Sequence, residues 1–379
     1  MHKNKKILFY VSEDWYFISH RLKLALFLQK KGYQINLCCK DTGRVNDILS
    51  YGIKWHNIEV ERKSLSFLQF FREVIIFYNE KNKIEPDILH LISMRQIVVG
   101  AFAAMTSSCK NVYLTFTGLG YLFTEKSIRS FLIRFLVGIS IFTTSKLLKA
   151  KAIVQNNDDK KYIIKKFHFS KDLITVIKGS GIDLKYFKIK PEIHNKKITI
   201  SYVGRLLKDK GIHCLVEAFK QAKKEHDNLK LILAGPLDIN NPSALSKKEL
   251  DNILKIKHIH YLGNVKDIRV VWNKTNIAIL LSKREGLPLS LIEAAATGRS
   301  IIATDVPGCR EIAKNGFNSF TVPYGDIKRT KDAIIKLAKN SDLRKNFSLF
   351  GRNLVEKEMA QEIIFSEYLK IYENNIAKN

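Results

Sequence analysis

The sequence lacks paired cysteine motifs, abundant proline and long apolar runs. Its five cysteines form no CxxC spacing and their number is odd, so we expect a reducing compartment and no zinc site. Seven prolines and 19 glycines in 379 residues exclude a collagen-like or low-complexity chain. The longest apolar stretch, residues 131–145, contains Arg134 and is shorter than the ~20 residues that a membrane-spanning helix needs. Residues 7–11 are too few for a signal-peptide core, so we expect a cytoplasmic protein without membrane spans.

A glycine-rich phosphate loop and a carboxylate cluster are also missing. The first expected strand, residues 6–11, is followed by Ser-Glu-Asp-Trp, which excludes the turn of a dinucleotide-binding dehydrogenase. No Asp-x-Asp follows a strand, and Asp158 and Asp159 stand at the head of an expected helix, where acids suit the helix dipole. The sequence therefore predicts neither a metal site nor a cofactor.

Positive charge is abundant. Lysine and arginine number 64 against 36 aspartates and glutamates, a net charge of +28, and both halves of the chain are basic. Such a charge attracts nucleic acid, an anionic membrane surface or phosphorylated substrates. No nucleic-acid recognition motif accompanies it, and a lysine-rich composition alone is the other explanation. A basic nucleic-acid-binding module without catalysis therefore remains the alternative function.

Apolar segments alternate with helical patterns along the chain. Continuous apolar strands separated by helices are typical of parallel sheets covered on both faces. The fold class is therefore α/β, with two doubly wound Rossmann-like domains facing across a cleft, where ligands bind at the carboxyl ends of the strands. The expected strands are residues 6–11, 34–38, 54–58, 87–92, 111–116, 152–155, 173–177, 198–203, 230–234, 258–262, 277–281, 300–304 and 319–322.

A polar, charged stretch at residues 186–197 is expected to be the linker between the domains. The expected domains are residues 1–190 and 191–360. Two helices close the chain, at about 326–356, with a break near Asn340, and at 360–376. We expect residues 361–379 to pack back on the first domain.

The first motif with chemical meaning is Val-Gly-Arg-Leu-Leu-Lys-Asp-Lys-Gly, which ends at Gly211 and follows the strand 198–203. A strand-to-helix turn presents free amide groups and the positive end of a helix dipole. Arg205 and Lys210 add two cations, so the turn is a candidate diphosphate site. A surface loop with ordinary lysines is the competing interpretation.

The second motif is Glu-Gly-Leu-Pro-Leu-Ser-Leu-Ile-Glu, from Glu285 to Glu293, after the strand 277–281. Pro288 suits the first position of a helix. The two carboxylates can accept hydrogen bonds from sugar hydroxyls, and the amides of Gly286 and Leu287 can bind phosphate. In the alternative interpretation, Glu285 is a capping acid and Glu293 is a solvated helix residue.

Together the two motifs resemble the signature of retaining glycosyltransferases of family 4, which have the GT-B fold. The likeness extends to Ala-Thr-Asp-Val-Pro-Gly-Cys-Arg-Glu at 303–311 and Gly-Asn-Val at 263–265. The segments 15–21 and 116–121 resemble acceptor-side loops of members that build bacterial surface polysaccharides.

The resemblance implies roles for the matching residues on the donor side. Arg205 and Lys210 would hold the donor diphosphate and stabilise the leaving group, with Glu285 at the donor sugar. Fixed cations would then replace a metal. The implied donor-binding residues are Gly204, Val265, Lys266, Gly286, Leu287 and Glu293, with Glu293 on the ribose and Val265 and Lys266 near the base.

On the acceptor side the sequence departs from the family. Many members have a histidine near the position of Thr117. Asp14, His20 and Thr117 are therefore the candidates for acceptor binding, although His20 could equally pack locally at a helix start.

The resemblance implies transfer of a hexose or N-acetylhexosamine from a nucleotide sugar, with UDP as the expected nucleotide. The implied acceptor is a lipid-linked saccharide in cell-envelope polysaccharide, lipopolysaccharide or glycan synthesis. It also implies location at the inner face of the cytoplasmic membrane, on an anionic surface, without nucleic acid. The aromatic and basic segments 65–77 and 127–151 are candidates for membrane contact, and core helices are the alternative. Cations at Arg129, Arg134, Lys146, Lys149 and Lys151 surround the second segment.

Overall fold

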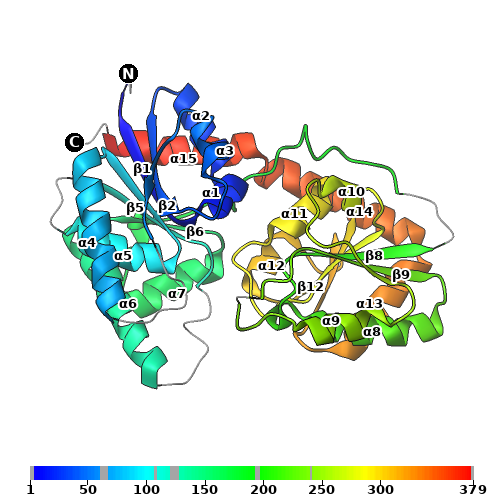
Figure 1. Cartoon of the computed structure of the whole chain (residues 1–379). Helices are drawn as coiled ribbons and strands as arrows, with labels where there is room; N and C mark the ends of the chain where they lie inside the picture. The colour runs from blue at the N-terminus through cyan, green and yellow to red at the C-terminus, as the bar shows by residue number, and fades with distance from the viewer. Residues whose placement is uncertain are drawn as a thin grey trace. The chain divides into compact units, whose positions relative to one another are not determined.

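The computed structural model describes residues 4–59, 67–105, 109–119, 128–192, 197–239 and 241–376, with side chains at 67, 128–134, 136, 375 and 376 excepted. The chain forms two compact units. The first comprises the residues up to Ser180 together with those from Glu362 onward, and the second comprises Gly181–Gln361. Figure 1 shows both, coloured along the chain.

The first unit is built on a parallel sheet with strand order β3-β2-β1-β4-β5-β6-β7. Side chains of β1 alternate between its faces: Leu8 and Tyr10 join the cluster under α4, α5 and α6, while Ile7 and Phe9 join the cluster with α2 and α15. Both faces are thus buried, as a parallel sheet requires. The strands are β1 (Lys6–Glu13), β2 (Gln34–Lys40), β3 (Lys54–Asn57), β4 (Ile88–Ile92), β5 (Asn111–Phe116), β6 (Lys151–Val154) and β7 (Ile174–Val176).

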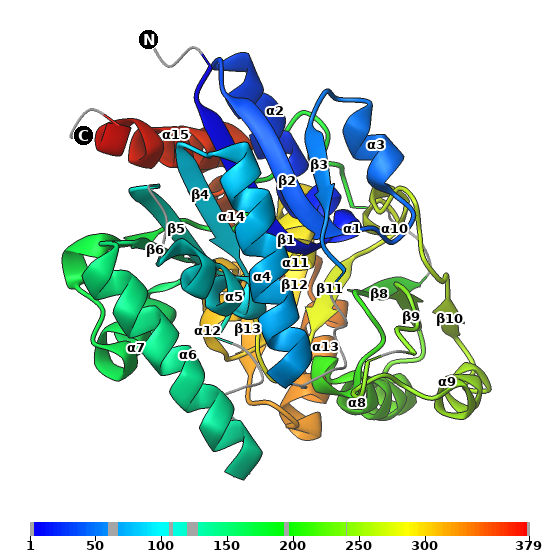
Figure 2. The same cartoon turned by 60° about the vertical axis from the view of Figure 1, so that its left-hand side comes forward.

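Helices cover both faces of this sheet (Figure 2). The α7 helix begins after Asn156, whose side chain accepts a hydrogen bond from the Asp159 amide at 2.7 Å. This cap, with acids in the first turn, explains why the helix starts there. The helices are α1 (Asp14–His20), α2 (Leu22–Lys30), α3 (Val45–Leu49), α4 (Phe67–Ile84), α5 (Met94–Ala104), α6 (Ile128–Leu147) and α7 (Asn157–Phe167), with the short 3₁₀ helix η2 (Lys171–Leu173).

The second unit contains a parallel sheet with strand order β10-β9-β8-β11-β12-β13. Its strands are β8 (Ile198–Val203), β9 (Leu229–Ala234), β10 (Ile259–Tyr261), β11 (Ile277–Leu280), β12 (Ser300–Thr304) and β13 (Ser319–Val322). Its helices are η3 (Lys208–Lys210), α8 (Ile212–Glu225), α9 (Lys247–Leu254), α10 (Arg269–Trp272), α11 (Leu289–Ala296), α12 (Pro307–Ile312), α13 (Ile327–Lys339) and α14 (Ser341–Glu358). The reversal of strand order beside β8 and β11 is the topological switch point of a doubly wound sheet.

The expected break near Asn340 separates α13 from α14, because the Asn340 side chain accepts a hydrogen bond from the Leu343 amide at 2.8 Å and so caps α14. The last helix, α15 (Gln361–Ile376), contributes Tyr368 and Tyr372 to the core of the first unit. The Tyr113 hydroxyl donates to the Ile371 carbonyl at 2.7 Å. Both views show this red helix beside the first unit's elements (Figures 1 and 2).

The boundary between the units differs from the expected one. The structure places it after Ser180, ten positions earlier than the sequence pattern indicates. Ile182 and Phe187 are buried in the second core, and Arg352 Nη1 donates to the Phe187 carbonyl at 2.8 Å. The described part of the expected linker, residues 186–192, is therefore packed against the second unit, because its apolar side chains outweigh its charged ones.

The residues after β1 also differ from expectation. Residues 12–17, expected as a loop, belong to the end of β1 and to α1. The short helix is stabilised by burial of Phe17, which is fully inaccessible to solvent. Within the described ranges, no helix combines the length and apolarity needed to cross a membrane.

Candidate active site

The turn after β8 carries the first predicted anion site. Gly204 has φ +154°, a conformation that favours glycine, and its amide donates to the Ala234 carbonyl at 2.9 Å. Gly235 lies directly against it, since a Cβ at Gly235 would stand 2.0 Å from the Gly204 oxygen. The two glycines let the turns after β8 and β9 pack closely, and Arg205 follows at the carboxyl edge of the sheet.

The Arg205 guanidinium is held by a carboxylate. Its Nη1 lies 2.9 Å from Asp238 Oδ2, and the two side chains are 39% and 25% exposed. A single, partly solvated ion pair of this kind contributes little to stability. Arg205 can therefore exchange Asp238 for another anion at small cost.

Lys210 reaches the site because η3 packs against the chain that follows β11. Gly211 has φ +75°, and a Cβ there would stand 2.2 Å from the Leu281 carbonyl oxygen. The Lys283 amide donates to the Asp209 carbonyl at 2.8 Å. Two segments 70 residues apart in the sequence are thus joined by backbone contacts, which fix the direction of the Lys210 side chain.

Lys210 and Glu285 form an ion pair in this position. Lys210 Nζ lies 2.5 Å from Glu285 Oε1, and the Ser282 hydroxyl donates to the same oxygen at 2.5 Å. Glu285 is 11% exposed and Ser282 is fully buried. Thr304 in turn donates to the Ser282 carbonyl at 2.6 Å. The carboxylate is therefore oriented by a rigid set of neighbours at the ends of β11 and β12.

The loop from Glu285 to Pro288 leads into α11. A Cβ at Gly308 would stand 2.5 Å from the Glu285 carbonyl oxygen and 2.4 Å from that of Gly286, so only glycine fits opposite this loop. Pro288 has φ −75° and ψ 110° and is the N-cap, so the helix begins at Leu289, one position later than expected. Gly286 and Leu287 thus immediately precede the helix N-terminus, as the predicted phosphate contacts require.

Glu293 lies one and a half turns into α11 and does not join the Lys210 pair. Its Oε2 accepts a hydrogen bond from the Trp272 indole at 3.2 Å. Burial raises the pKa of Glu293 to about 7, against a smaller lowering by that hydrogen bond. The carboxyl therefore changes its charge near neutral pH. Of the predicted base contacts, Val265 packs beside the Ile232 cluster and Lys266 is exposed.

In the first unit, Asp14 follows β1 and is fully buried. Its carboxylate accepts hydrogen bonds from the Thr42 amide at 2.7 Å, the Arg44 amide at 2.9 Å and the Thr42 hydroxyl. Burial opposes ionisation, but these hydrogen bonds outweigh it and lower the pKa of Asp14. Asp14 thus holds the loop after β2, and its predicted acceptor contact stays a prediction.

His20 and Thr117 are the other acceptor candidates. The His20 ring packs on Tyr16 at 4.7 Å between centroids, and its buried Nδ1 has no hydrogen-bond partner in the described part of the chain. Burial, with the charge of Arg21, lowers the pKa of His20 to about 4, so the ring is neutral at pH 7. Thr117 follows β5 at the same edge and is half-buried.

The polar groups at these edges offer no cage for a metal ion. Over the described ranges, no three side chains among histidine, cysteine, aspartate and glutamate come together as a candidate metal site. The anion-binding groups that the second unit does present are Arg205, Lys210 and the amides before α11.

Comparisons with known proteins agree with this geometry. Residues 185–354 match the family model for glycosyl transferases group 1, and residues 6–156 match the model for glycosyl transferase 4-like domains. The chain is a glycosyltransferase, with one of these family models matched in each half. Its structure is the GT-B fold of two Rossmann-like units, which confirms the fold class predicted from the sequence.

This glycosyltransferase is similar to bacterial relatives over most of its length. It is 28% identical to the capsular polysaccharide biosynthesis glycosyltransferase CapM of Staphylococcus aureus, over 91% of each chain. It is 25% identical to the N,N'-diacetylbacillosaminyl-diphospho-undecaprenol alpha-1,3-N-acetylgalactosaminyltransferase of Campylobacter jejuni, over 86% of this chain and 87% of that one.

Solved structures share the fold at lower identity. Sucrose-phosphate synthase from Thermosynechococcus elongatus superposes with a TM-score of 0.84 and 17% identity, over 99% of this chain and all of that one. HepE from Anabaena, in complex with UDP and glucose, superposes with a TM-score of 0.79 and 15% identity, over 98% of this chain and all of that one.

Three further residues of the glycosyltransferase touch the predicted site residues and were not identified from the sequence. Asp238 pairs with Arg205, Ser282 with Glu285, and Trp272 with Glu293. Ser282 directly follows a buried strand, and this position at the carboxyl edge was the available signal. Asp238 and Trp272 carry no local signal, because they lie far in sequence from the residues that they contact.

Proposed function

We propose that the enzyme transfers a hexose or N-acetylhexosamine from a UDP-sugar to a lipid-linked saccharide, with retention of anomeric configuration. The observation that supports this most directly is the arrangement of Arg205, Lys210 and the N-terminus of α11 at the switch point of the second sheet. Two cations and the backbone amides at a helix N-terminus suit a diphosphate better than any other common ligand.

In the free enzyme each cation is paired, Arg205 with Asp238 and Lys210 with Glu285. The donor diphosphate replaces these carboxylates as the partner of the two cations. Glu285, released from Lys210 and still bound by Ser282, then accepts a hydrogen bond from a hydroxyl of the donor sugar. The pairs keep the empty site close to neutral and the cations oriented.

The transfer step breaks the bond between the anomeric carbon and the diphosphate oxygen, and the electron pair leaves with the diphosphate. Arg205, Lys210 and the amides of Gly286 and Leu287 stabilise this developing charge. The acceptor hydroxyl attacks the same face, and its proton passes to the departing phosphate oxygen. Configuration is retained without a protein nucleophile.

The remainder of the donor is held by α11 and the loop before α10. Glu293, when ionised, accepts hydrogen bonds from the ribose hydroxyls, and Trp272 holds its carboxylate in place. The base lies near Val265 and Lys266. UDP is proposed as the nucleotide because the HepE structure contains UDP and because an Escherichia coli relative, 25% identical over 87% of this chain, is named a UDP-Gal transferase.

The proposed acceptor is a saccharide on a lipid diphosphate, as the names of the Campylobacter jejuni and Escherichia coli relatives state for those enzymes. It would bind at the carboxyl edge of the first sheet, near His20 and Thr117, with Asp14 supporting the adjoining loop. A lipid-linked acceptor requires the enzyme to reach a membrane surface.

The first unit has a face suited to that contact. Helices α4 and α6, which both pack against α5, expose large apolar side chains, and Lys146 and Lys149 lie exposed near the end of α6. Lys151 is half-buried, while the side chains of Arg129 and Arg134 lie outside the described residues. We propose reversible, salt-sensitive attachment of this face to the anionic inner surface of the cytoplasmic membrane. The exposed apolar residues are Leu68, Phe71, Ile75, Phe135, Ile139 and Phe142.

The decisive experiment incubates the purified enzyme with a panel of UDP-sugars and polyprenyl-diphosphate saccharides, and determines the product's anomeric configuration by NMR. Transfer from one UDP-sugar with retention is expected. Inverted product would contradict the proposed mechanism, and transfer from none of the UDP-sugars would contradict the donor assignment.

Metal independence is tested in the same assay. Because the cations that hold the diphosphate belong to the chain, EDTA should leave the rate unchanged. Loss of transfer in EDTA and its recovery on adding magnesium or manganese would show that a divalent ion neutralises the leaving group instead.

A further inference from the structure

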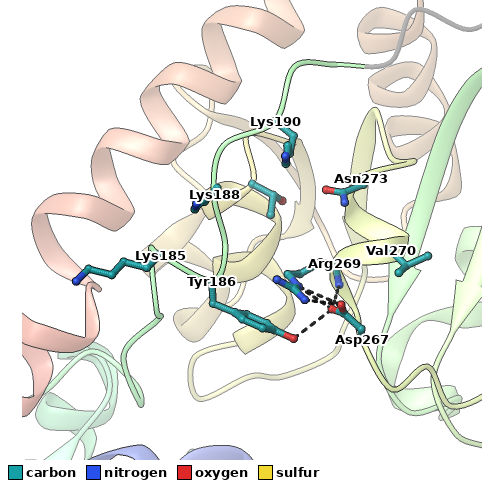
Figure 3. Close-up of a pocket in the computed structure, with 9 residues that line it drawn as sticks. Lys185, Tyr186, Lys188, Lys190, Asp267, Arg269, Val270 and Asn273 are labelled. Carbon is teal, nitrogen blue, oxygen red and sulfur yellow. Dashed lines mark hydrogen bonds and ion pairs between the residues drawn. The ribbon is translucent and has the colours of Figure 1, made fainter.

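A cavity of about 390 Å³ in the second unit lies outside the proposed donor site. It is formed by the chain segment that enters this unit, by α10 and by the end of α11. The side chains that matter for its chemistry are Lys188, Lys190, Asp267, Arg269, Asn273 and Thr297 (Figure 3). A volume of this size accommodates a small organic ligand.

One wall of the cavity is rigid. Arg269 lies over the Tyr186 ring at 3.6 Å from its centroid, and it binds Asp267 through Nε at 2.9 Å and Nη2 at 2.6 Å. The Tyr186 hydroxyl donates to the same aspartate at 3.3 Å. Hydrogen bonds from Arg269 lower the pKa of Asp267 to about 2, so this pair stays ionised and neutral overall. The Arg269 guanidinium also interacts with the Tyr186 side chain through a hydrogen bond, so the wall is held at both Asp267 and Tyr186.

The lysines leave the cavity with an excess of positive charge. Lys185 extends away from Arg269, while Lys188 and Lys190 also line the cavity (Figure 3). Neither Lys188 nor Lys190 has a carboxylate within ion-pair distance in the described ranges. The side chains of Asn273 and Thr297 add neutral polar groups beside them. The cavity thus combines two ammonium groups that have no carboxylate partner in the described ranges with a guanidinium that Asp267 and Tyr186 hold in place.

The cavity wall is held by the second unit itself. The Lys190 amide donates to the Thr297 carbonyl at 3.3 Å, and Arg299, which is buried, donates to the Lys190 carbonyl. Arg344 Nε binds Glu192 at 2.6 Å, two residues further along. The backbone that carries the two lysines is therefore fixed before any ligand arrives, which reduces the entropy cost of binding.

The cavity is separate from the diphosphate site. Thr297 is the C-cap of α11, whereas Gly286 and Leu287 precede its N-terminus. Eight helical residues lie between them, which corresponds to about 12 Å at 1.5 Å per residue. One phosphate group cannot reach both ends of this helix.

We propose that this cavity binds a soluble phosphate-bearing compound, through Lys188 and Lys190 beside the guanidinium of Arg269, independently of the sugar donor. Charge-assisted hydrogen bonds from two lysines and an arginine are the usual means by which proteins bind phosphate. Bound there, the phosphate joins the entry segment of the second unit to α10, and so stabilises that unit.

The test uses inorganic pyrophosphate as the probe, at constant ionic strength, with calorimetry to count sites. The full-length double variant Arg205→Gln/Lys210→Gln removes the proposed donor site, and one site per chain should remain. Adding Lys188→Gln and Lys190→Gln to this variant should weaken the affinity of the remaining site for pyrophosphate about tenfold or more. The matched control replaces Lys345 and Lys357, exposed lysines of α14, by glutamine and should leave the affinity unchanged.

Two results would overturn the proposal: no binding in the Arg205/Lys210 variant, or binding that the cavity and control lysine changes weaken equally. Failure of the donor assignment gives a different result, because the Arg205/Lys210 changes would then remove no site. A second experiment uses vesicles containing phosphatidylglycerol. Their sedimentation with the enzyme should not depend on Lys188 and Lys190, and a dependence would assign the cavity to a lipid headgroup and contradict a soluble ligand.

Discussion

At the carboxyl edge of the second sheet, Lys210 and Glu285 meet at 2.5 Å across a turn that two backbone contacts fix. At the corresponding edge of the first sheet, Asp14 is used to hold a neighbouring loop, and His20 is neutral with a buried nitrogen that lacks a partner in the described ranges. In the proposed function, the second unit therefore places its cations where the diphosphate departs, whereas the first unit uses its buried carboxylate for structure and keeps His20 neutral. The difference indicates that the second unit supplies the electrostatic stabilisation of the proposed reaction.

Removing the cations of the second unit tests this difference between the units most directly and should have the largest effect on activity. Arg205→Ala and Lys210→Ala should each lower kcat/KM by about one to two decades, since a charge-assisted contact contributes about 1.5–3 kcal/mol. Lys208→Ala is the matched control, because Lys208 lies in η3 but pairs with Glu249 at 3.2 Å. Thermal unfolding should be close to that of the parent enzyme for all three, and near-normal turnover of the double variant would refute the diphosphate assignment.

Ser282→Ala tests whether orientation of Glu285 matters beyond its charge. The hydroxyl donates to the same oxygen that Lys210 contacts, so its loss should reduce kcat by about tenfold while the donor KM changes little. Ser282→Thr keeps the hydroxyl and should recover most of the rate. If the alanine and threonine variants lose equal activity, packing at this buried position rather than the hydrogen bond is responsible.

The titration of Glu293 adds a pH dependence that the first unit should not show. With a pKa of about 7, the carboxyl is protonated below neutrality, so the donor KM should rise up to about tenfold per pH unit as the pH falls below 7. Glu293→Gln should abolish this dependence. An unchanged pH profile in this variant would assign the titration to another group.

The raised pKa of Glu293 also predicts that the folded protein is less stable at neutral pH than at acidic pH. Because the folded-state pKa of Glu293 lies above its unfolded value of 4.5, the folded protein binds the proton more tightly. The free energy of unfolding should therefore fall as the pH rises from about 4.5 to 7. Urea unfolding at several pH values should show a smaller fall for Glu293→Gln than for the parent enzyme.

The smallest effect is expected in the first unit. His20→Asn should raise the acceptor KM several-fold and leave the donor KM unchanged, since a neutral hydrogen bond contributes about 0.5–1.5 kcal/mol. Steady-state kinetics with each substrate varied in turn makes the distinction. A change confined to the donor KM would place His20 at the donor and remove the proposed division between the units.

The strands and the capped helices could be predicted because their signals are local. Residues 111–116, 198–203 and 300–304 are strands with the expected bounds, and the helix break expected near Asn340 lies at that residue, which caps α14. Buried parallel strands give contiguous apolar runs, and a cap needs one side chain. The fold class followed from their alternation.

The unit boundary and the partners of the site residues could not be predicted, because they depend on contacts between segments far apart in the sequence. The unit boundary at Ser180 is set by burial of Ile182 and Phe187, which a charged stretch concealed. The partners Asp238 and Trp272 could not be paired with Arg205 and Glu293 from spacing alone, because close approach of separate segments creates these contacts. The motif residues themselves were identifiable, since their types and order suit an anion site.

The return of the chain to the first unit through α15 has a consequence for synthesis on the ribosome. Tyr368 and Tyr372 complete the core that covers Ile7 and Phe9, yet they are translated after the whole of the second unit. Domains generally fold in the order of their emergence. Here the first sheet emerges first but keeps one face incomplete until α15 has been translated, so the nascent chain exposes its whole second unit before it can close its first.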